Sequence, residues 1–161
     1  ILVFVFHMRT ETERQECGQE AQELIEFICE NNEEAKEYLN LLLSALRIID
    51  DVYDEDYPIT KQHLMAAFEI LFVKLPLNIF YQTHQKELQT QHVIAWNTWE
   101  VSNVLNKSSN DYDRMYAQVL SGYIHELLPY VAYLIGGYAK MKKVNGLIRS
   151  FYQGPLEEKN G

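Results

Sequence analysis

Residues that break helices are scarce in this sequence, and this scarcity limits the folds open to it. Only 7 glycines and 4 prolines occur among 161 residues. A many-stranded sheet needs turns at short intervals, and these two residue types supply most of them. Hydrophobic residues make up 47% of the chain, which is enough to bury a core. We therefore predict an all-α fold for residues 1–161, a single-domain irregular bundle of about five helices.

The spacing of apolar residues predicts where these helices lie. They are expected over residues 10–31, 32–53, 60–74, 79–105 and 111–142. Asn32 and Thr60 are placed to cap the second and third helices. The last helix is long and largely buried, and Pro129 or the Gly136–Gly137 pair is expected to bend it. Asn145–Gly146 predicts a break, and residues 154–161 are expected to form a peripheral tail.

The first seven residues are apolar but do not resemble a signal peptide. They lack a charged start and a cleavage site of small residues. Met8 begins a more ordinary sequence, so our hypothesis is that Met8 is the natural start and residues 1–7 are a non-native leader. We expect this apolar segment to pack into a groove, either on its own domain or on a neighbouring copy.

The charge of the chain argues against two classes of partner. A formal net charge of -9 does not suit nucleic acid or an anionic membrane surface, because both attract a surplus of lysine and arginine. The 2 cysteines, Cys17 and Cys29, fall in one predicted helix about 18 Å apart, which is too far for a disulfide. We expect free thiols in a reducing cytoplasm, and the pair lacks the spacing of a zinc site.

Acidic residues crowd together at the end of the second predicted helix. Five carboxylates fall within seven residues, from Asp50 to Asp56. Like charges packed this tightly repel one another, so they need solvent, a cation or a basic partner. Asp50 and Asp54 lie one helical turn apart, and two carboxylates so placed can share a Mg²⁺ ion. We predict Asp50, Asp51 and Asp54 as magnesium ligands; the alternative is an acidic helix end exposed to solvent.

The same residues resemble a known magnesium motif. Asp50-Asp51-Val52-Tyr53-Asp54 is similar to the DDxxD motif by which all-helical isoprenoid synthases hold magnesium and diphosphate. The resemblance implies a Mg²⁺-dependent enzyme that acts on a phosphate or diphosphate ester. The chain departs from that family because it is shorter and carries neither a second acidic motif nor a basic cluster for the diphosphate.

A second acidic pattern resembles that of the all-α nucleotide pyrophosphatases. Glu33-Glu34-x-x-Glu37 is followed by Asp51-x-x-Asp54, which is similar to the EExxE and ExxD motifs of that family. The family brings its two motifs together on separate helices. Here no glycine or proline lies between Glu37 and Asp51, so the two patterns would lie about 20 Å apart on one helix. We therefore interpret Glu33 and Glu34 as an acidic first helical turn.

Two histidines are candidates for acid–base chemistry. His92 shares one side of the fourth predicted helix with the two tryptophans of the chain, and Glu100 lies near it. An aromatic stripe at this spacing is also typical of a plain core. His125 belongs to a polar stripe on the fifth predicted helix that includes Arg114. This stripe is either a solvated face or faces the second helix, where the two side chains would neutralise the acidic cluster.

Two functional hypotheses follow from these patterns. The first is a small soluble helical protein that acts by binding or assembly, as a homo-oligomer, with a small-molecule ligand of unknown identity. The 11 tyrosines fit either a Tyr-lined pocket or a dimer interface. The alternative is the Mg²⁺-dependent enzyme, with His92 or His125 as the acid/base. The sequence contains no serine-hydrolase or dinucleotide-binding motif, so neither of these enzyme classes is predicted.

Overall fold

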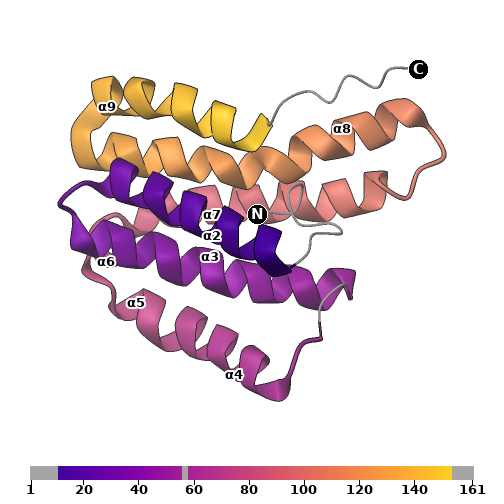
Figure 1. Cartoon of the computed structure of the whole chain (residues 1–161), viewed down its shortest axis with the longest axis horizontal. Coiled ribbons are helices and arrows are strands. Elements are labelled where there is room, and N and C mark those ends of the chain that lie inside the picture. The colour runs from indigo at the N-terminus through magenta and orange to yellow at the C-terminus, as the bar shows by residue number, and fades with distance from the viewer. Residues whose placement is uncertain (1–10, 56–57, 154–161) are drawn as a thin grey trace.

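Helices joined by short loops make up the computed structural model, which describes residues 11–55 and 58–153 (Figure 1). No β-strand occurs in these two ranges, so the predicted all-α fold is confirmed. The expectations for residues 1–10 and 154–161 lie outside the described residues. The helices are α2 (Glu11–Cys29), α3 (Glu33–Asp54), α4 (Lys61–Glu69), α5 (Leu75–Leu77), α6 (Ile79–Thr83), α7 (Gln85–Leu105), α8 (Asp111–Ser121) and α9 (Leu127–Gln153). The π-helical segment η1 (Ile70–Lys74) joins α4 to α5, and the 3-10 segment η2 (Gly122–Glu126) joins α8 to α9.

Both predicted helix caps are confirmed. The backbone N–H of Ala35 donates to Oδ1 of Asn32 at 2.9 Å, which satisfies a donor at the start of α3. At the start of α4, the N–H of His63 donates to Oγ1 of Thr60 at 3.3 Å. The N–H of Thr60 donates in turn to Nδ1 of His63 at 3.3 Å. His63 thus takes the position that glutamate or glutamine usually occupies in a capping box.

Three predicted helices are less regular than expected. The helix predicted over residues 60–74 changes to π-helical geometry at Ile70. The helix predicted over residues 79–105 is interrupted at His84, where the backbone has φ −114° and ψ 27°. The helix predicted over residues 111–142 changes to 3-10 geometry over Gly122–Glu126, directly before the turn that contains Pro129. Proline has no N–H to donate to the carbonyl four residues earlier, so this irregularity lies where Pro129 was expected to disturb the helix.

Two glycine sites in α9 behave differently. At Gly137 the backbone leaves helical geometry (φ 72°, ψ −168°) and the chain doubles back on itself (Figure 1). The predicted bend at Gly136–Gly137 is therefore confirmed. The predicted break at Asn145–Gly146 is wrong, because the helix continues to Gln153. Val144 and Ile148 lie on either side of Gly146 and are buried, so their packing outweighs the low helix propensity of glycine.

Alanine substitutions at the two glycines are expected to have opposite effects on stability. A Cβ at Gly137 would meet no atom within 4 Å, so the main change is backbone strain at φ 72°. That conformation is nearly restricted to glycine, and Gly137→Ala should lower the free energy of unfolding by about 1–3 kcal/mol. Gly146 is helical, and a Cβ there would also meet no atom within 4 Å. Gly146→Ala should therefore raise the free energy of unfolding by about 0.5–1 kcal/mol. Urea denaturation followed by circular dichroism measures both, and two changes of the same sign would contradict this account.

The helices pack so that α3 lies between two other layers. α2 packs against α9 and α3, and α7 lies beside α8. α4, η1 and α5 form the outer edge of the molecule and pack on α3 (Figure 1). Among the residues whose burial is described, the largest fully buried side chains include Tyr38, Ile28, Leu39, Leu88 and Val131. They come from α2, α3, α7 and α9, so these four helices all contribute side chains to the core.

Asn78 fixes the turn that leads from the outer edge into α6. Its side chain is 3% exposed and donates from Nδ2 to the carbonyl of Glu34 at 3.0 Å and to Oε2 of Glu37 at 2.9 Å. Its Oδ1 accepts from the N–H of Tyr81 at 2.9 Å, which caps α6. This buried amide ties the beginning of α6 to the first turns of α3. α7 follows α6 directly in the chain, so this turn also leads the chain into α7.

Candidate functional site

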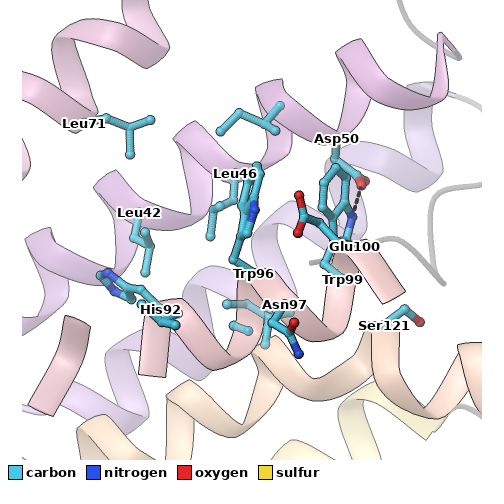
Figure 2. Close-up of a pocket in the computed structure, with 14 residues that line it drawn as sticks. Leu42, Leu46, Asp50, Leu71, His92, Trp96, Asn97, Trp99, Glu100 and Ser121 are labelled. Atoms are coloured by element: carbon cyan, nitrogen blue, oxygen red, sulfur yellow. Dashed lines mark hydrogen bonds between the residues drawn. The ribbon is translucent and has the colours of Figure 1, made fainter. Parts of the chain in front are cut away.

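A cleft of about 580 Å³ lies between α3 and α7 (Figure 2). Fourteen residues line it, and nine of them are aliphatic or tryptophan side chains. The five polar lining residues are Asp50, His92, Asn97, Glu100 and Ser121. A cavity of this size, mostly apolar and with a few polar groups, has the character of a binding site for another molecule.

Helical periodicity explains why the cleft is apolar. α3 contributes Leu42, Leu46 and Ile49, which recur every three or four residues and form one stripe. η1 contributes Leu71 from the opposite side, and Ile124 of η2 adds to the lining. Tyr38 lies one turn before Leu42 on the same stripe but is fully buried, and Leu42 itself belongs to the core. One apolar stripe of α3 therefore packs into the core at its start and lines the cleft toward its end.

One end of the cleft is formed by His92, whose ring is hydrogen-bonded to the buried Tyr38 behind it. The hydroxyl of Tyr38 and Nε2 of His92 are 2.7 Å apart and hydrogen-bonded. The His92 ring stacks on Tyr38 and on Tyr81, with interplanar angles of 10° and 8°. Burial lowers the pKa of His92 to about 4, because the charged imidazolium is poorly solvated there. Burial also raises the pKa of Tyr38, so both groups are neutral near pH 7.

The other end of the cleft is acidic and aromatic. The indole N–H of Trp99 donates to Oδ1 of Asp50 at 3.4 Å, which orients both side chains (Figure 2). The rings of Trp96 and Trp99 have centroids 5.1 Å apart. Glu100 follows Trp99 on α7, and Figure 2 shows its carboxylate at the same end as that of Asp50. We call these four residues the acidic end of the cleft. Eight residues separate Glu100 from His92 on α7, so the two ends are about 12 Å apart.

The predicted magnesium ligands lie in different surroundings. Asp50 lines the cleft, Asp51 forms an ion pair with Arg47 at 4.0 Å, and Asp54 is the last residue of α3. Within the residues that the structure describes, no group of three His, Cys, Asp or Glu side chains is arranged to hold a metal ion. The fifth carboxylate of the cluster, Asp56, lies outside these residues. Magnesium binding by the cluster stays a prediction.

The other candidate side chains do not gather at one site. His92 lines the cleft, whereas His125 lies in η2 and does not line it. Arg114 pairs with Asp111 on its own helix and donates from Nη1 to the carbonyl of Ser108 at 2.9 Å. Arg114 thus stabilises the loop before α8, and these contacts do not connect it to the acidic cluster of α3. No lysine or arginine is among the fourteen lining residues of the cleft.

Cys29 is a buried thiol without a partner cysteine. It is 1% exposed, and burial raises its pKa to about 12. A thiol of this kind stays protonated at neutral pH and is a poor nucleophile. Cys29 therefore packs as a core residue. The expectation of a free thiol is confirmed for this residue.

Sequence patterns indicated the apolar stripes that line the cleft but missed the contacts between distant segments that complete it. The stripe of His92, Trp96 and Trp99 on α7 was visible from its spacing, and Glu100 was placed near it. The opposite wall includes Leu71, whose position depends on how η1 packs on α3. The pairing of His92 with Tyr38 was also missed, because the two residues lie 54 positions apart and no local signal connects them.

Comparisons with protein-family models, with curated proteins and with solved structures find no match for this chain. Among the residues that the structure describes, no helix is both long enough and apolar enough to cross a membrane.

Proposed function

We propose that this protein is a binding module that holds the apolar face of an amphipathic helix from a partner protein in the cleft between α3 and α7. The observation that carries the proposal is the apolar cleft itself, with a volume of about 580 Å³ and an apolar stripe on each of its walls. Grooves of this kind take the side chains of a helix at positions i, i+3, i+4 and i+7. The two turns of α7 between His92 and Glu100 provide about 12 Å of wall, enough for about two turns of a docked helix.

Exposed apolar side chains around the cleft favour a helix over a small molecule as its ligand. On α7, Val93 and Trp96 line the cleft and are 69% and 45% exposed. On the opposite side, Phe68 lies one turn before Leu71 and stacks on Phe72, with ring centroids 5.9 Å apart. Phe68 and Phe72 are 52% and 73% exposed. Apolar side chains thus continue beyond the cavity on both sides, and large exposed apolar surfaces usually mark contacts with other proteins.

The properties of the cleft favour binding over the alternative of a Mg²⁺-dependent enzyme. Phosphate and diphosphate esters are anionic, and their sites contain lysine, arginine or metal ions. The lining of this cleft holds Asp50 and Glu100 but no lysine or arginine. His92, the candidate acid/base in the cleft, has a pKa of about 4, far from the neutral range in which such catalysis is most efficient.

A matched pair of valine substitutions tests the proposed site. The probe is a fluorescently labelled helical peptide made only of leucine and lysine, with all leucines on one face. Val93 and Val104 are both on α7 and are 69% and 72% exposed, but only Val93 lines the cleft. We expect Val93→Gln to raise the Kd of the peptide about fivefold to tenfold and Val104→Gln to change it less than about twofold.

Fluorescence anisotropy gives the two Kd values, and circular dichroism shows that each variant is folded. Because both valines are exposed, neither substitution should alter stability by more than about 0.5 kcal/mol. Absence of peptide binding to the wild-type protein, or equal effects of the two substitutions, would overturn the proposal.

A further inference from the structure

The two ends of the cleft differ in charge, and this difference indicates which charge a bound partner should carry. The His92 end is neutral near pH 7, because burial disfavours the imidazolium. The opposite end contributes two carboxylates, those of Asp50 and Glu100, from two different helices. A docked helix therefore meets apolar side chains along most of the cleft and negative charge at one end only.

We propose that the partner helix carries a lysine or arginine at one end of its apolar face, and that this cation occupies the acidic end of the cleft. This inference rests on the proposed function and names the chemistry of the partner. The geometry places two kinds of cation-binding group together there. Carboxylates form charge-assisted hydrogen bonds with ammonium and guanidinium groups. Indole rings attract the same cations through their faces.

The aromatic cluster at the acidic end already has a lysine of this chain on its outer side. Tyr53 packs edge-on against Trp99, with ring centroids 4.9 Å apart. Nζ of Lys107 lies 5.8 Å from the centroid of the Tyr53 ring, within the range of a cation–π contact. The same cluster exposes the indole of Trp96, which is 45% exposed, to the cleft. A second cation, from the partner, would bind on that inner side next to Glu100.

A second copy of this chain is a poorer occupant than a basic helix. The chain carries a formal net charge of -9, so two copies repel each other at long range. In a symmetric pair joined through the cleft, the same patch of each copy is used, and Asp50 and Glu100 from both copies would share one interface. Like charges brought together in an interface oppose association. A basic partner removes both penalties.

Two peptides with the same leucine positions test the inference. One contains only leucine and lysine, and the other contains only leucine and glutamate. We expect the lysine peptide to bind the wild-type protein at least about tenfold more tightly at low salt, because its charges complement the cleft. Glu100→Gln should raise the Kd of the lysine peptide about threefold to fivefold, which is the upper part of the range for an exposed ion pair.

Glu87→Gln is the matched control for general charge attraction. Glu87 is also an exposed glutamate of α7, but it lies about 20 Å from Glu100 along the helix and does not line the cleft. Its substitution removes the same unit of charge and should change the Kd less than about 1.5-fold. If Glu87→Gln and Glu100→Gln have equal effects, attraction is a property of the whole acidic surface and the inference is overturned.

The outcomes separate this inference from the proposed function. If the glutamate peptide binds as tightly as the lysine peptide and Val93→Gln weakens both, the cleft binds helices but selects no cation. If neither peptide binds, the proposed function fails and the inference fails with it. Sedimentation equilibrium of the full chain without peptide adds one more test. A dimer that Val93→Gln dissociates, with Val104→Gln as control, would make a second copy the occupant and overturn the basic partner.

Discussion

Replacing Tyr38 with alanine is expected to lower the free energy of unfolding by about 4 kcal/mol, because it removes the largest fully buried side chain among the described residues. The Tyr38 ring has its centroid 5.7 Å from that of Phe80, 6.1 Å from that of Tyr81 and 6.1 Å from that of His92. These three rings belong to α6 and α7, whereas Tyr38 belongs to α3. The truncation would open a cavity where three helices meet. Single domains are usually stable by only about 5–15 kcal/mol, so this is a large fraction of the total.

Two further tyrosine variants show which part of the side chain matters. Tyr38→Phe keeps the ring and removes the hydroxyl, which leaves Nε2 of His92 without its partner at 2.7 Å. We expect a loss of about 1–2 kcal/mol, the usual range for breaking one buried hydrogen bond. Tyr112→Ala is the surface control, since Tyr112 is 67% exposed and its truncation should change stability by less than about 0.5 kcal/mol. Urea denaturation gives all three values, and equal losses for Tyr38→Phe and Tyr38→Ala would contradict the packing argument.

Local features of this fold could be predicted from the sequence, because their causes lie within a few residues. The cap at Asn32 depends on a hydrogen bond to a residue three positions away, and the cap at Thr60 does likewise. The reversal at Gly137 follows from the ability of glycine to adopt a positive φ. The apolar stripes of α3 and α7 follow from helical periodicity, and they turned out to be the two main walls of the cleft.

Features that depend on packing between distant segments could not be predicted in this way. No proline or glycine lies at His84, so the sequence gives no local signal for the interruption there. α6, the helix before His84, is held in place by the buried amide of Asn78, which is bonded to α3. Gly146 has the composition of a break, yet the buried Val144 and Ile148 keep it helical. At the acidic end of the cleft, Asp50 of α3 and Glu100 of α7 line the same cavity. The sequence alone indicated only that Asp50 lies in a cluster with the other acidic residues at the end of α3.

The stability of the protein should fall steeply between pH 6.5 and pH 4, and His92 is the expected cause. Burial lowers the pKa of His92 to about 4 in the folded protein, from 6.5 in the unfolded chain. Between these two values the unfolded chain binds a proton that the folded protein does not. Stability therefore rises with pH across this window, is fully present above pH 6.5, and is lost as the pH falls toward 4. A difference of 2.5 pH units corresponds to about 3 kcal/mol.

His92→Gln isolates this contribution, because glutamine does not titrate and its side-chain oxygen can still accept a hydrogen bond from Tyr38. Carboxylates that titrate below pH 5 are the same in both proteins, so they cancel in the difference. We expect the wild-type protein to lose about 3 kcal/mol more than His92→Gln between pH 6.5 and pH 4, as measured by urea denaturation at each pH. Parallel curves would contradict a buried, neutral His92. A neutral His92 also leaves Asp50 and Glu100 as the only charged groups that line the cleft near pH 7, and the preference for a basic partner depends on that condition.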